Sequence, residues 1–389
     1  MMQLLLNADL FTPGPLGHRH VLVAGGRVVW IGERIPVFPD GLVERVDLHG
    51  ARVIPGLIDC HAHLTGGGGE AGPETRVPPL ALSRLTTGGV TTVVGVLGTD
   101  DTIRTPAELV TTAQALTALG ITAFCYTGGY HVPPATVTGS VRGDMVLIDR
   151  VLGVGEIAIS DHRSSQPTRD ELLRLAADAH VGGLMSGKAG IVHLHVGDGE
   201  RGLAPVRDAI HATELPASVF HPTHVNRRRR LFEDACGLAR EGVTIDITAF
   251  PIGPDEDAWP ADEALMRYLD AGSPPELVTV SSDAGGCLPV FDDDGRVTAM
   301  DVGEPMALAT TLRRMLAGGS PLARVLPAFT SNVARLLRLG RKGHIAEGGD
   351  ADLVVLSADG AVNDVMAGGA WMVRDGRPLV QGPFEVRPL

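Results

Sequence analysis

Lysine is the residue that this sequence most lacks. Lys188 and Lys342 are the only two in 389 residues, so the other basic side chains are arginines. The net charge is −13, and a short arginine run at 227–230 is the only local basic cluster. A protein that follows a phosphate backbone needs a basic stripe or patch. We therefore expect no nucleic-acid partner.

Cysteine pairs and long apolar stretches are also missing. The four cysteines, at positions 60, 125, 236 and 287, are widely spaced and form no C-x-x-C motif. This is typical of reduced thiols in a cytoplasmic protein. No apolar stretch reaches the roughly 18 residues that span a bilayer. The first residues, MMQLLLNADLF, have neither the charged start nor the cleavage site of a signal peptide. We expect a cytoplasmic protein with no membrane partner.

The two ends of the chain have β-type patterns. Residues 20–33 contain two short β-type runs joined by Ala-Gly-Gly, and residues 351–379 repeat the pattern with Asp-Gly turns. These pieces flank one long α/β segment, so they can pair into a single small sheet domain. We expect the first and last segments of the division 1–52, 53–340 and 341–389 to form that domain.

Eight apolar runs rich in β-branched residues recur in the middle segment, and helical patterns separate most of them. The runs lie near 53–59, 90–97, 121–126, 154–159, 190–196, 217–223, 243–249 and 277–282. Strands that alternate with helices at this period predict an α/β fold, specifically a (β/α)8 TIM-like barrel. An open doubly wound sheet is the alternative, but no G-x-G-x-x-G motif follows the first run to support it.

Metal-capable side chains lie in or directly after five of these runs. The set comprises His61, His63, Glu156, His195, His224 and Asp283. Their intervals correspond to about three, one, one and two βα units, which places them on strands 1, 4, 5, 6 and 8 of one barrel. The carboxyl ends of barrel strands meet at one face, so we expect these side chains to converge there.

The residue types indicate which metal this set would bind. Four imidazoles and two carboxylates suit a pair of Zn²⁺ ions or another borderline divalent pair. Glu156 lies within an apolar strand, where an unpaired charge is costly, and metal binding accounts for its presence there. Three further histidines, His131, His193 and His221, are interpreted as lining or core residues rather than ligands.

Several motifs resemble the amidohydrolase superfamily and, within it, the isoaspartyl (β-aspartyl) dipeptidase family. The superfamily features are PGLIDCHAHL and GHIAEGGDADLVVL. The closer features are HAHLTGGGGEAGPETR, GVLGTD, TGGYHVP, SDHRS, PTHVNR and SSDAGG, which run through most of the chain. The resemblance implies a binuclear zinc barrel with a small β-sandwich domain formed by both termini. It also implies cleavage of β-aspartyl dipeptides and a homo-oligomer, which is commonly an octamer in that family.

The resemblance assigns metal roles to matching positions. It implies that His61 and His63 bind one zinc and that His195 and His224 bind the other. Asp283 matches the residue that binds metal and shuttles the proton. A carboxylate in that place can accept a proton and later deliver it to the leaving amine.

The resemblance also assigns roles towards the substrate. Tyr130 matches the tyrosine that polarises the scissile carbonyl, where a hydroxyl donor stabilises the developing oxyanion. Glu70 matches the group that binds the α-ammonium of the substrate. Gly68 and Thr99 lie in matching stretches of the pocket wall.

The carboxylate of the substrate has its own matching residues. Arg163 and Arg227 match its binders, since guanidinium groups fork onto carboxylates. Arg163 can instead pair with Asp161, which together with His162 is interpreted as structural or supporting. The family has a serine near Cys287 that helps to hold this carboxylate, and a thiol is a weaker donor.

The fourth strand departs from the family pattern. The family places there a lysine, carboxylated by CO₂, that bridges the zincs, whereas this sequence has GVGE at 153–156 and no lysine nearby. We therefore expect no carboxylated lysine and Glu156 as the bridging ligand. Glutamate reaches roughly 3–4 Å less far, at about 1.5 Å per single bond. GVGE has one residue more than the Gly-Val-Lys of the family, so we predict that Gly155 bulges the strand inward.

These observations predict a binuclear zinc metallopeptidase that hydrolyses β-aspartyl dipeptides by attack of a metal-bridging hydroxide. Another amidohydrolase, either an N-acyl amino acid deacylase or a cyclic amide hydrolase, is the alternative. The combination of Glu70 with Arg227 favours a zwitterionic substrate instead. A non-catalytic barrel scaffold is a further alternative, disfavoured because every ligand position holds a competent residue.

Overall fold

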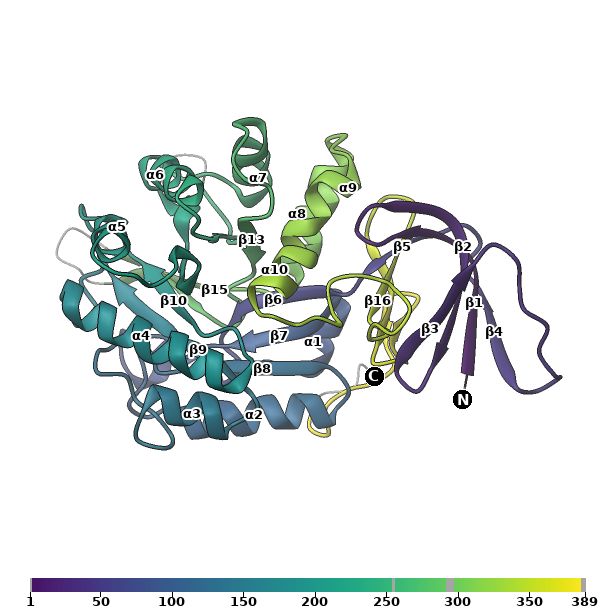
Figure 1. The fold of residues 1–389 in the computed structure, drawn as a ribbon, viewed down its shortest axis with the longest axis horizontal. Helices are drawn as coiled ribbons and strands as arrows, with labels where there is room; N and C mark the ends of the chain where they lie inside the picture. Colours follow the sequence, from purple (N-terminus) through teal and green to yellow (C-terminus); the bar gives the residue numbers. More distant parts are fainter. Residues whose placement is uncertain (1, 254–255, 292–296, 386–389) are drawn as a thin grey trace.

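Six parallel strands form a curled sheet in the larger part of the molecule (Figure 1). The structure is a computed structural model that describes residues 2–253, 256–291 and 297–385. In this part of the chain the sheet has the order β11-β10-β9-β8-β7-β6. The strands are β6 (Leu57–Ala62), β7 (Val90–Gly95), β8 (Thr122–Thr127), β9 (Val151–Ile159), β10 (Ile191–Val196) and β11 (Phe220–Thr223). Spatial neighbours are also neighbours along the chain, as repeated βα units require.

Two further parallel strands, β12 (Ile245–Thr248) and β13 (Val278–Ser281), pair with each other. β12 contacts β11, and β13 contacts β6. An isolated bridge joins Ala62, at the end of β6, to Ala284 just after β13. The predicted α/β fold is thus confirmed as a curled parallel sheet, and each of the eight predicted runs overlaps one of these strands.

The first predicted run, 53–59, requires a correction, because the structure divides it between two sheets. β5 (Arg52–Pro55) pairs with β1 (Met2–Phe11) and with β16 (Leu353–Leu356), which belong to a sheet made by the chain ends. The parallel sheet begins only at Leu57. Residues 53–58 are all buried and carry no charge, so periodicity alone does not separate the two strands.

Helices lie around the outer side of the curled sheet (Figure 1). They are α1 (Leu82–Thr87), α2 (Pro106–Ala118), α3 (Val141–Leu147), α4 (Arg169–Ser186), α5 (Ala204–His211), α6 (Arg229–Arg240), α7 (Ala261–Asp270), α8 (Met306–Ala317), α9 (Leu322–Val325) and α10 (Ser331–Leu336). Local signals set their ends. Thr168 and Glu171 form a capping box at the start of α4, and Gly187 closes it in the left-handed conformation.

Both ends of the chain form one nine-stranded sheet in the described ranges. Its purple and yellow strands lie together in Figure 1. The order is β19-β18-β17-β16-β5-β1-β2-β3, with β4 beside β1. The strands not yet given are β2 (Pro15–Ala24), β3 (Arg27–Gly32), β4 (Val43–Asp47), β17 (Val362–Ala367), β18 (Ala370–Arg374) and β19 (Arg377–Pro378). The expected pairing of the two terminal pieces into one sheet is confirmed by the β5–β16 ladder.

Each sheet has its own hydrophobic cluster. Leu10, Val53 and Leu353 belong to the cluster of the terminal sheet. Val93 and Phe220 belong to a larger cluster that packs the parallel strands against their helices. Most of the apolar core of the larger part therefore lies between the strands and their helices, and a separate, smaller cluster includes Cys60, Val94 and Tyr126.

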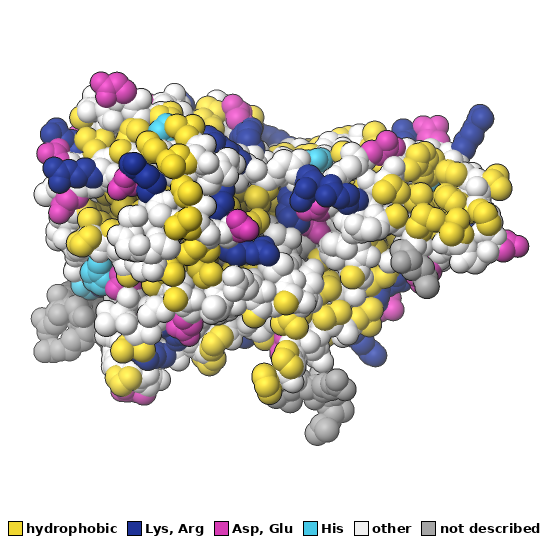
Figure 2. Space-filling model, turned by 60° about the horizontal axis from the view of Figure 1, so that its bottom comes forward, with side chains coloured by type: hydrophobic (Ala, Val, Ile, Leu, Met, Phe, Trp, Pro, Cys, Tyr) yellow, Lys and Arg dark blue, Asp and Glu magenta, His cyan; other side chains and the backbone are white. Residues whose placement is uncertain are grey.

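The surface mixes charges of both signs. Figure 2 shows Lys and Arg groups beside Asp and Glu groups on one face, with hydrophobic side chains between them. None of the helices in the described ranges combines the length and the apolar character needed to cross a bilayer.

Lys342 provides a test of how the terminal sheet is held. Its buried ammonium lies 2.5 Å from Asp352 Oδ2 and 3.1 Å from Asp350 Oδ2. The Lys342→Met change leaves the buried Asp352 carboxylate without a counter-ion, whereas Asp350 keeps its pair with Arg341. We therefore expect the free energy of unfolding to fall by about 3 kcal/mol in urea denaturation. Arg313→Met, which breaks the exposed pair with Asp359, should cost less than about 1 kcal/mol. Equal losses in the two variants would contradict this expectation.

Candidate active site

A bulge in β9 positions Glu156. Val154 of β9 pairs with Val192 of β10, whereas the next paired residues are Ile157 and Leu194. β9 therefore contains one residue more than β10 over this interval, which is the definition of a β-bulge. The bulge redirects the strand at the position of Glu156.

Gly155 makes this bulge possible. Its φ of 154° is a backbone conformation that residues with a side chain rarely adopt. A Cβ at this position would lie 2.6 Å from the carbonyl oxygen of His193 on β10. The predicted bulge at Gly155 is thus confirmed, and it leaves the Glu156 carboxylate 1% exposed.

The Glu156 carboxylate lies between four histidines. Its Oε2 is 3.7 Å from His61 Nε2, 3.3 Å from His195 Nδ1 and 3.5 Å from His224 Nε2. Its Oε1 is 3.5 Å from His63 Nε2. His61 and His195 lie within β6 and β10, while His63 and His224 follow β6 and β11 directly. The curl of the sheet therefore brings together side chains that are far apart in sequence.

Asp283 joins this cluster from just beyond β13. Its Oδ1 is 3.3 Å from His61 Nε2 and 3.2 Å from His63 Nε2. Three of the converging atoms, His61 Nε2, Glu156 Oε2 and Asp283 Oδ1, are buried without a hydrogen-bond partner among the described residues. Buried polar atoms are normally paired, so this convergence fits a positive ion that accepts their lone pairs.

The donor set supports the same interpretation. Groups of three of these side chains place donor atoms within 4.8 Å of one another: His61, His63 and Glu156; His61, His224 and Asp283; Glu156, His195 and His224. Mixed imidazole and carboxylate donors suit Zn²⁺ and other borderline divalent ions. The residues present therefore fit a pair of divalent metal ions.

Neighbouring polar groups orient the histidines towards Glu156. His224 Nδ1 lies 2.8 Å from the Thr248 hydroxyl, which leaves Nε2 facing the carboxylate. His195 Nε2 lies 2.9 Å from Asp161 Oδ2, which leaves Nδ1 facing it. Such contacts are typical of metal-binding imidazoles. Asp161, which the sequence analysis interpreted as structural or supporting, thus contacts His195 directly.

The pKa values show how strongly these groups are coupled. Burial raises the pKa of Glu156, but the charge of His61 and contacts from His195 and His224 hold it well below its usual value. Burial raises the pKa of Asp283 too, and the neighbouring histidines lower it below its usual range. Burial lowers the pKa of His61, while Glu156 and Asp283 raise it to about 9. Both carboxylates are thus ionised and suited to a cation.

Tyr130 lies against His195. The ring centroids are 4.6 Å apart, and the Tyr130 hydroxyl is 2.8 Å from His195 Nδ1. The guanidinium of Arg163 is 5.4 Å from the centre of the tyrosine ring. Burial raises the pKa of Tyr130 well above its usual value. The phenol therefore keeps its proton and can donate a hydrogen bond.

A cavity of about 700 Å³ opens beside the cluster. The predicted site residues that line it are His63, Gly68, Glu70, Thr99, Tyr130, Glu156, Arg163, His195, His224, Arg227, Asp283 and Cys287. His61 is fully buried and contacts the cluster from within β6. The structure thus brings every predicted site residue to one place.

Glu70 presents an unpaired oxygen to this cavity. Its Oε1 accepts a hydrogen bond of 3.1 Å from the Thr99 hydroxyl and lies 3.5 Å from Arg163 Nη1. Its Oε2 is buried and has no hydrogen-bond partner in the described part of the chain. A Cβ on Gly68 would lie 2.4 Å from the Thr75 carbonyl oxygen, so the preceding loop needs glycine there. Glu70 Oε2 can therefore accept a donor from a bound molecule.

Two arginines line the same cavity. Arg163 donates through Nε and Nη2 to Asp161 at 3.0 and 2.8 Å, and it also approaches Glu70. The predicted pairing with Asp161 is present, and Arg163 also lines the cavity. Arg227 donates to the Val196 carbonyl at 2.9 Å. Each guanidinium has five N–H donors in a planar fork, a geometry that matches a carboxylate.

Sequence reasoning missed part of the cavity wall. The missed lining residues include Arg104, Asp198, Phe250, Ile252, Glu256 and Leu288. The segment after β12 could have been found, because the carboxyl ends of parallel strands carry the site in such folds. Cys287 lines the cavity as a neutral thiol, since burial and the nearby Glu70 raise its pKa to about 11.

The sequence profile of the amidohydrolase family matches residues 52–372. This chain belongs to the amidohydrolase family. A solved structure with high similarity is the β-aspartyl dipeptidase of the thermophilic, keratin-degrading Fervidobacterium islandicum AW-1 in complex with β-Asp-Leu dipeptide. It is 44% identical, has a TM-score of 0.92, and aligns over 100% of both chains. The resemblance to this dipeptidase family is thereby confirmed, as is the class of metal-dependent hydrolase.

Other members of the superfamily are more distant. Imidazolonepropionase of Salinispora arenicola (strain CNS-205) is 27% identical over 96% of this chain and 95% of its own length. For the enzyme of that name in Pseudomonas aeruginosa (strain UCBPP-PA14), 39% identity is confined to 21% of this chain and 18% of its own. Dihydropyrimidinase of Brevibacillus agri NCHU1002 is 17% identical, with a TM-score of 0.70 over 98% and 96% of the chains, and shares the fold alone.

Gly155→Ala tests the bulge. The added Cβ would meet the His193 carbonyl oxygen in a backbone conformation unsuited to alanine, so we expect the free energy of unfolding to fall by at least about 2 kcal/mol. Urea denaturation measures the change. Gly340→Ala is the matched control, because a Cβ there meets nothing within 4 Å and should change stability by less than about 0.5 kcal/mol. A Gly155→Ala protein as stable as this control would show that the bulge tolerates a side chain.

Proposed function

We propose that this chain hydrolyses β-aspartyl dipeptides with the help of two divalent metal ions, Zn²⁺ being the best match to its ligands. The observation that carries the proposal is the unpaired Oε2 of Glu70 in a cavity shared with two guanidinium groups and the Glu156 cluster. A dipeptide zwitterion has one ammonium and two carboxyl-derived ends, which complement these groups. The β-Asp-Leu complex of the Fervidobacterium relative supports the same substrate class.

The metal-binding roles follow the predicted assignment. His61 and His63 would hold one ion, His195 and His224 the other, and Glu156 would bridge them. When bound, such ions supply Lewis acidity to a carbonyl and lower the pKa of a coordinated water. Asp283 contacts the first pair of histidines and would bind metal as well.

A carboxylated lysine has no place in this proposal. The Lys188 ammonium donates to the carbonyl oxygens of Met145 and Ile148, near the end of α3. Lys342 is paired with Asp350 and Asp352 beside the terminal sheet. Neither lysine lines the cavity. The Glu156 carboxylate supplies the two oxygens and the single negative charge that a carbamate would otherwise provide.

The remaining steps belong to protein side chains. Asp283, ionised and close to the histidines, would take the proton of the attacking water and return it to the leaving amine. The protonated phenol of Tyr130 would donate a hydrogen bond to the carbonyl oxygen as negative charge develops there. Glu70 would bind the α-ammonium, and Arg163 and Arg227 the carboxylate, which fixes the β-aspartyl group relative to Asp283.

The finer description of the fold has support as well. The contact of β13 with β6 supports closure of the eight parallel strands into a (β/α)8 barrel. The terminal sheet would form the small β-sandwich domain. In the proposed division 1–52, 53–340 and 341–389, the first boundary would move from residue 52 to residue 55, because β5 belongs to this sheet. A homo-oligomer and a cytoplasmic location stay predictions.

A substrate panel tests the proposed function. We expect hydrolysis of β-Asp-Leu at a kcat/KM at least about 100-fold above that of α-Asp-Leu and N-acetyl-leucine, because only the β-linkage fits the charged groups on both sides. Activity on the N-acyl amino acid or on imidazolonepropionate, with none on β-Asp-Leu, would replace the proposal with one of the alternatives.

Glu70→Gln tests the ammonium contact. The neutral amide removes a charge-assisted hydrogen bond, so we expect the KM for β-Asp-Leu to rise roughly 10- to 100-fold while kcat changes less. Glu74→Gln, an exposed position in the same loop that does not line the cavity, is the control and should leave both constants unchanged. Equal kinetics in the two variants would remove Glu70 from substrate binding.

Glu156→Ala tests the bridge. Without the carboxylate the two ions repel each other and lose a shared ligand, so we expect elemental analysis to find fewer than two tightly bound metals per chain. Adding bicarbonate to metal-free wild-type protein should not increase activity on reconstitution. An active Glu156→Ala protein with two tightly bound metals, or activation by bicarbonate, would rule out the bridging role.

A further inference from the structure

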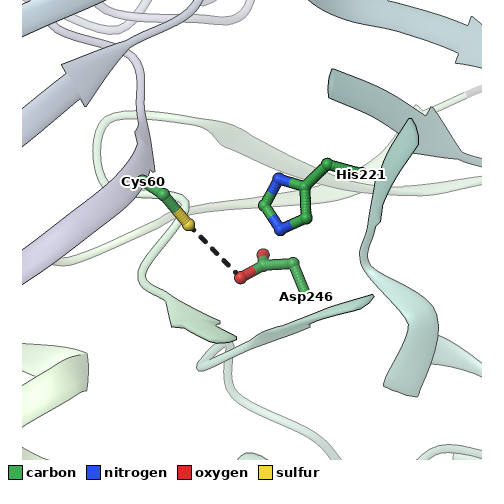
Figure 3. A group of neighbouring side chains, drawn as sticks. All are labelled: Cys60, His221 and Asp246. Carbon is green, nitrogen blue, oxygen red and sulfur yellow. Dashed lines mark hydrogen bonds between the residues drawn. The ribbon is translucent and has the colours of Figure 1, made fainter. Parts of the chain in front are cut away.

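A second group of polar side chains lies inside the curl of the sheet, next to the Glu156 cluster. Cys60 of β6, His221 of β11 and Asp246 of β12 face one another there (Figure 3). All three are buried, and their donor atoms lie within 4.8 Å of one another. Their chemistry alone would allow a third metal ion.

The hydrogen bonds of this group argue against a metal ion. Asp246 Oδ1 accepts from Cys60 Sγ at 3.4 Å and from the Thr279 hydroxyl at 2.6 Å. Its Oδ2 accepts from the hydroxyls of Thr223 at 2.7 Å and Ser281 at 2.5 Å. Four donors thus saturate this carboxylate, whereas the Glu156 cluster contains unpartnered buried atoms. A fully paired network of this kind needs no cation.

A chain of short contacts connects this carboxylate to the other cluster. His221 Nε2 lies 3.1 Å from the Thr279 hydroxyl. His221 Nδ1 lies 2.9 Å from His193 Nδ1, and His193 Nε2 lies 2.7 Å from His61 Nδ1. The ring of Tyr126 stacks on His193 at 5.0 Å and helps to fix its plane. The contacts therefore run without a gap from Asp246 to His61.

The direction of each of these hydrogen bonds can be deduced in turn, starting from Asp246. Because the Thr279 hydroxyl gives its one hydrogen to the carboxylate, it can only accept from His221 Nε2–H. A neutral His221 then accepts at Nδ1 from His193 Nδ1–H. A neutral His193 accepts in turn at Nε2 from His61 Nδ1–H. Each N···N contact receives one hydrogen, and the lone pair of His61 is left on Nε2.

The opposite direction conflicts with metal binding. If His193 were cationic, it would donate from both nitrogens. His61 would then have to accept at Nδ1 and would carry its own hydrogen on Nε2. That atom faces Glu156 and Asp283 and could then bind no metal.

We propose that Asp246 sets, through this chain, the tautomer with which His61 faces the metal pair. Thr279, His221 and His193 are then positioning residues, each of which accepts a hydrogen bond from the side of His61 and donates one towards Asp246. The inference rests on the proposed metal function. In this arrangement the tautomer of His61 depends on several hydrogen bonds in series. His195 and His224 are instead oriented by single contacts with Asp161 and Thr248.

Three substitutions at the far end of the chain test this proposal. Thr279→Val keeps the shape but removes the hydroxyl, so we expect zinc at the weaker of the two sites to bind about 10-fold or more less tightly in chelator competition. Thr279→Ser keeps the hydroxyl and should restore affinity to within about 3-fold of wild type. Ser281→Ala also removes a donor from Asp246, but off the chain, and should likewise stay within about 3-fold.

The outcomes separate the role in the chain from general stability. Equal loss of metal in Thr279→Val and Ser281→Ala, or no loss in either, would overturn the proposal. If Thr279→Val fails to fold, His193→Gln and His193→Met replace it, because glutamine can accept from His61 and donate to His221 while methionine cannot donate. A visible absorption spectrum of the Co²⁺-loaded protein that changes in His193→Met and not in His193→Gln supports the chain, and equal spectra overturn it.

A wild-type measurement distinguishes the two proposals. Wild-type protein that binds no divalent metal would refute the proposed function itself. Wild-type protein that binds two metals and cleaves β-Asp-Leu, with Thr279→Val binding them equally well, would refute only the role of the chain.

Discussion

The site depends on one buried carboxylate in the middle of a strand. Glu156 is 1% exposed, and a charge in such surroundings is stable only where other groups compensate it. No local segment can supply that compensation, because the nearest partners lie on β6, on β10 and just after β11. The curl of the parallel sheet and the bulge at Gly155 are therefore linked conditions. The first gathers the histidines, and the second brings a short side chain to their centre.

Around Glu156 the side chains inside the curl are mostly polar, because most of the apolar core lies elsewhere. Helices cover the outer face of the strands, and most of the hydrophobic packing is there. Along β10 the side chains of His193 and His195 point to the same side, since alternate residues of a strand share a face. One contacts His61, and the other contacts Glu156. Such an interior is stable only if nearly every polar atom has a partner.

The wall of the cavity is built differently from the Glu156 cluster. Glu70, Thr99 and Arg227 lie on segments that follow strands, so they can change without disturbing the sheet. Relatives with other names, such as imidazolonepropionase of Salinispora arenicola, align over nearly the whole chain at 27% identity. The fold therefore does not decide the substrate, which depends on the charges around the cavity.

The sequence by itself determined the number and order of the parallel strands, the pairing of the two ends, and the metal-capable side chains at strand ends. Because it has no lysine near strand 4, the sequence also predicted that Glu156 and Gly155 are where the chain departs from the family pattern. These features are local or countable along the chain. Only the tertiary structure divided 53–59 between two sheets, gave Arg163 its double contact and joined Asp246 to His61. Hydrogen bonds between distant strands depend on spacings of a few tenths of an ångström, which no periodicity encodes.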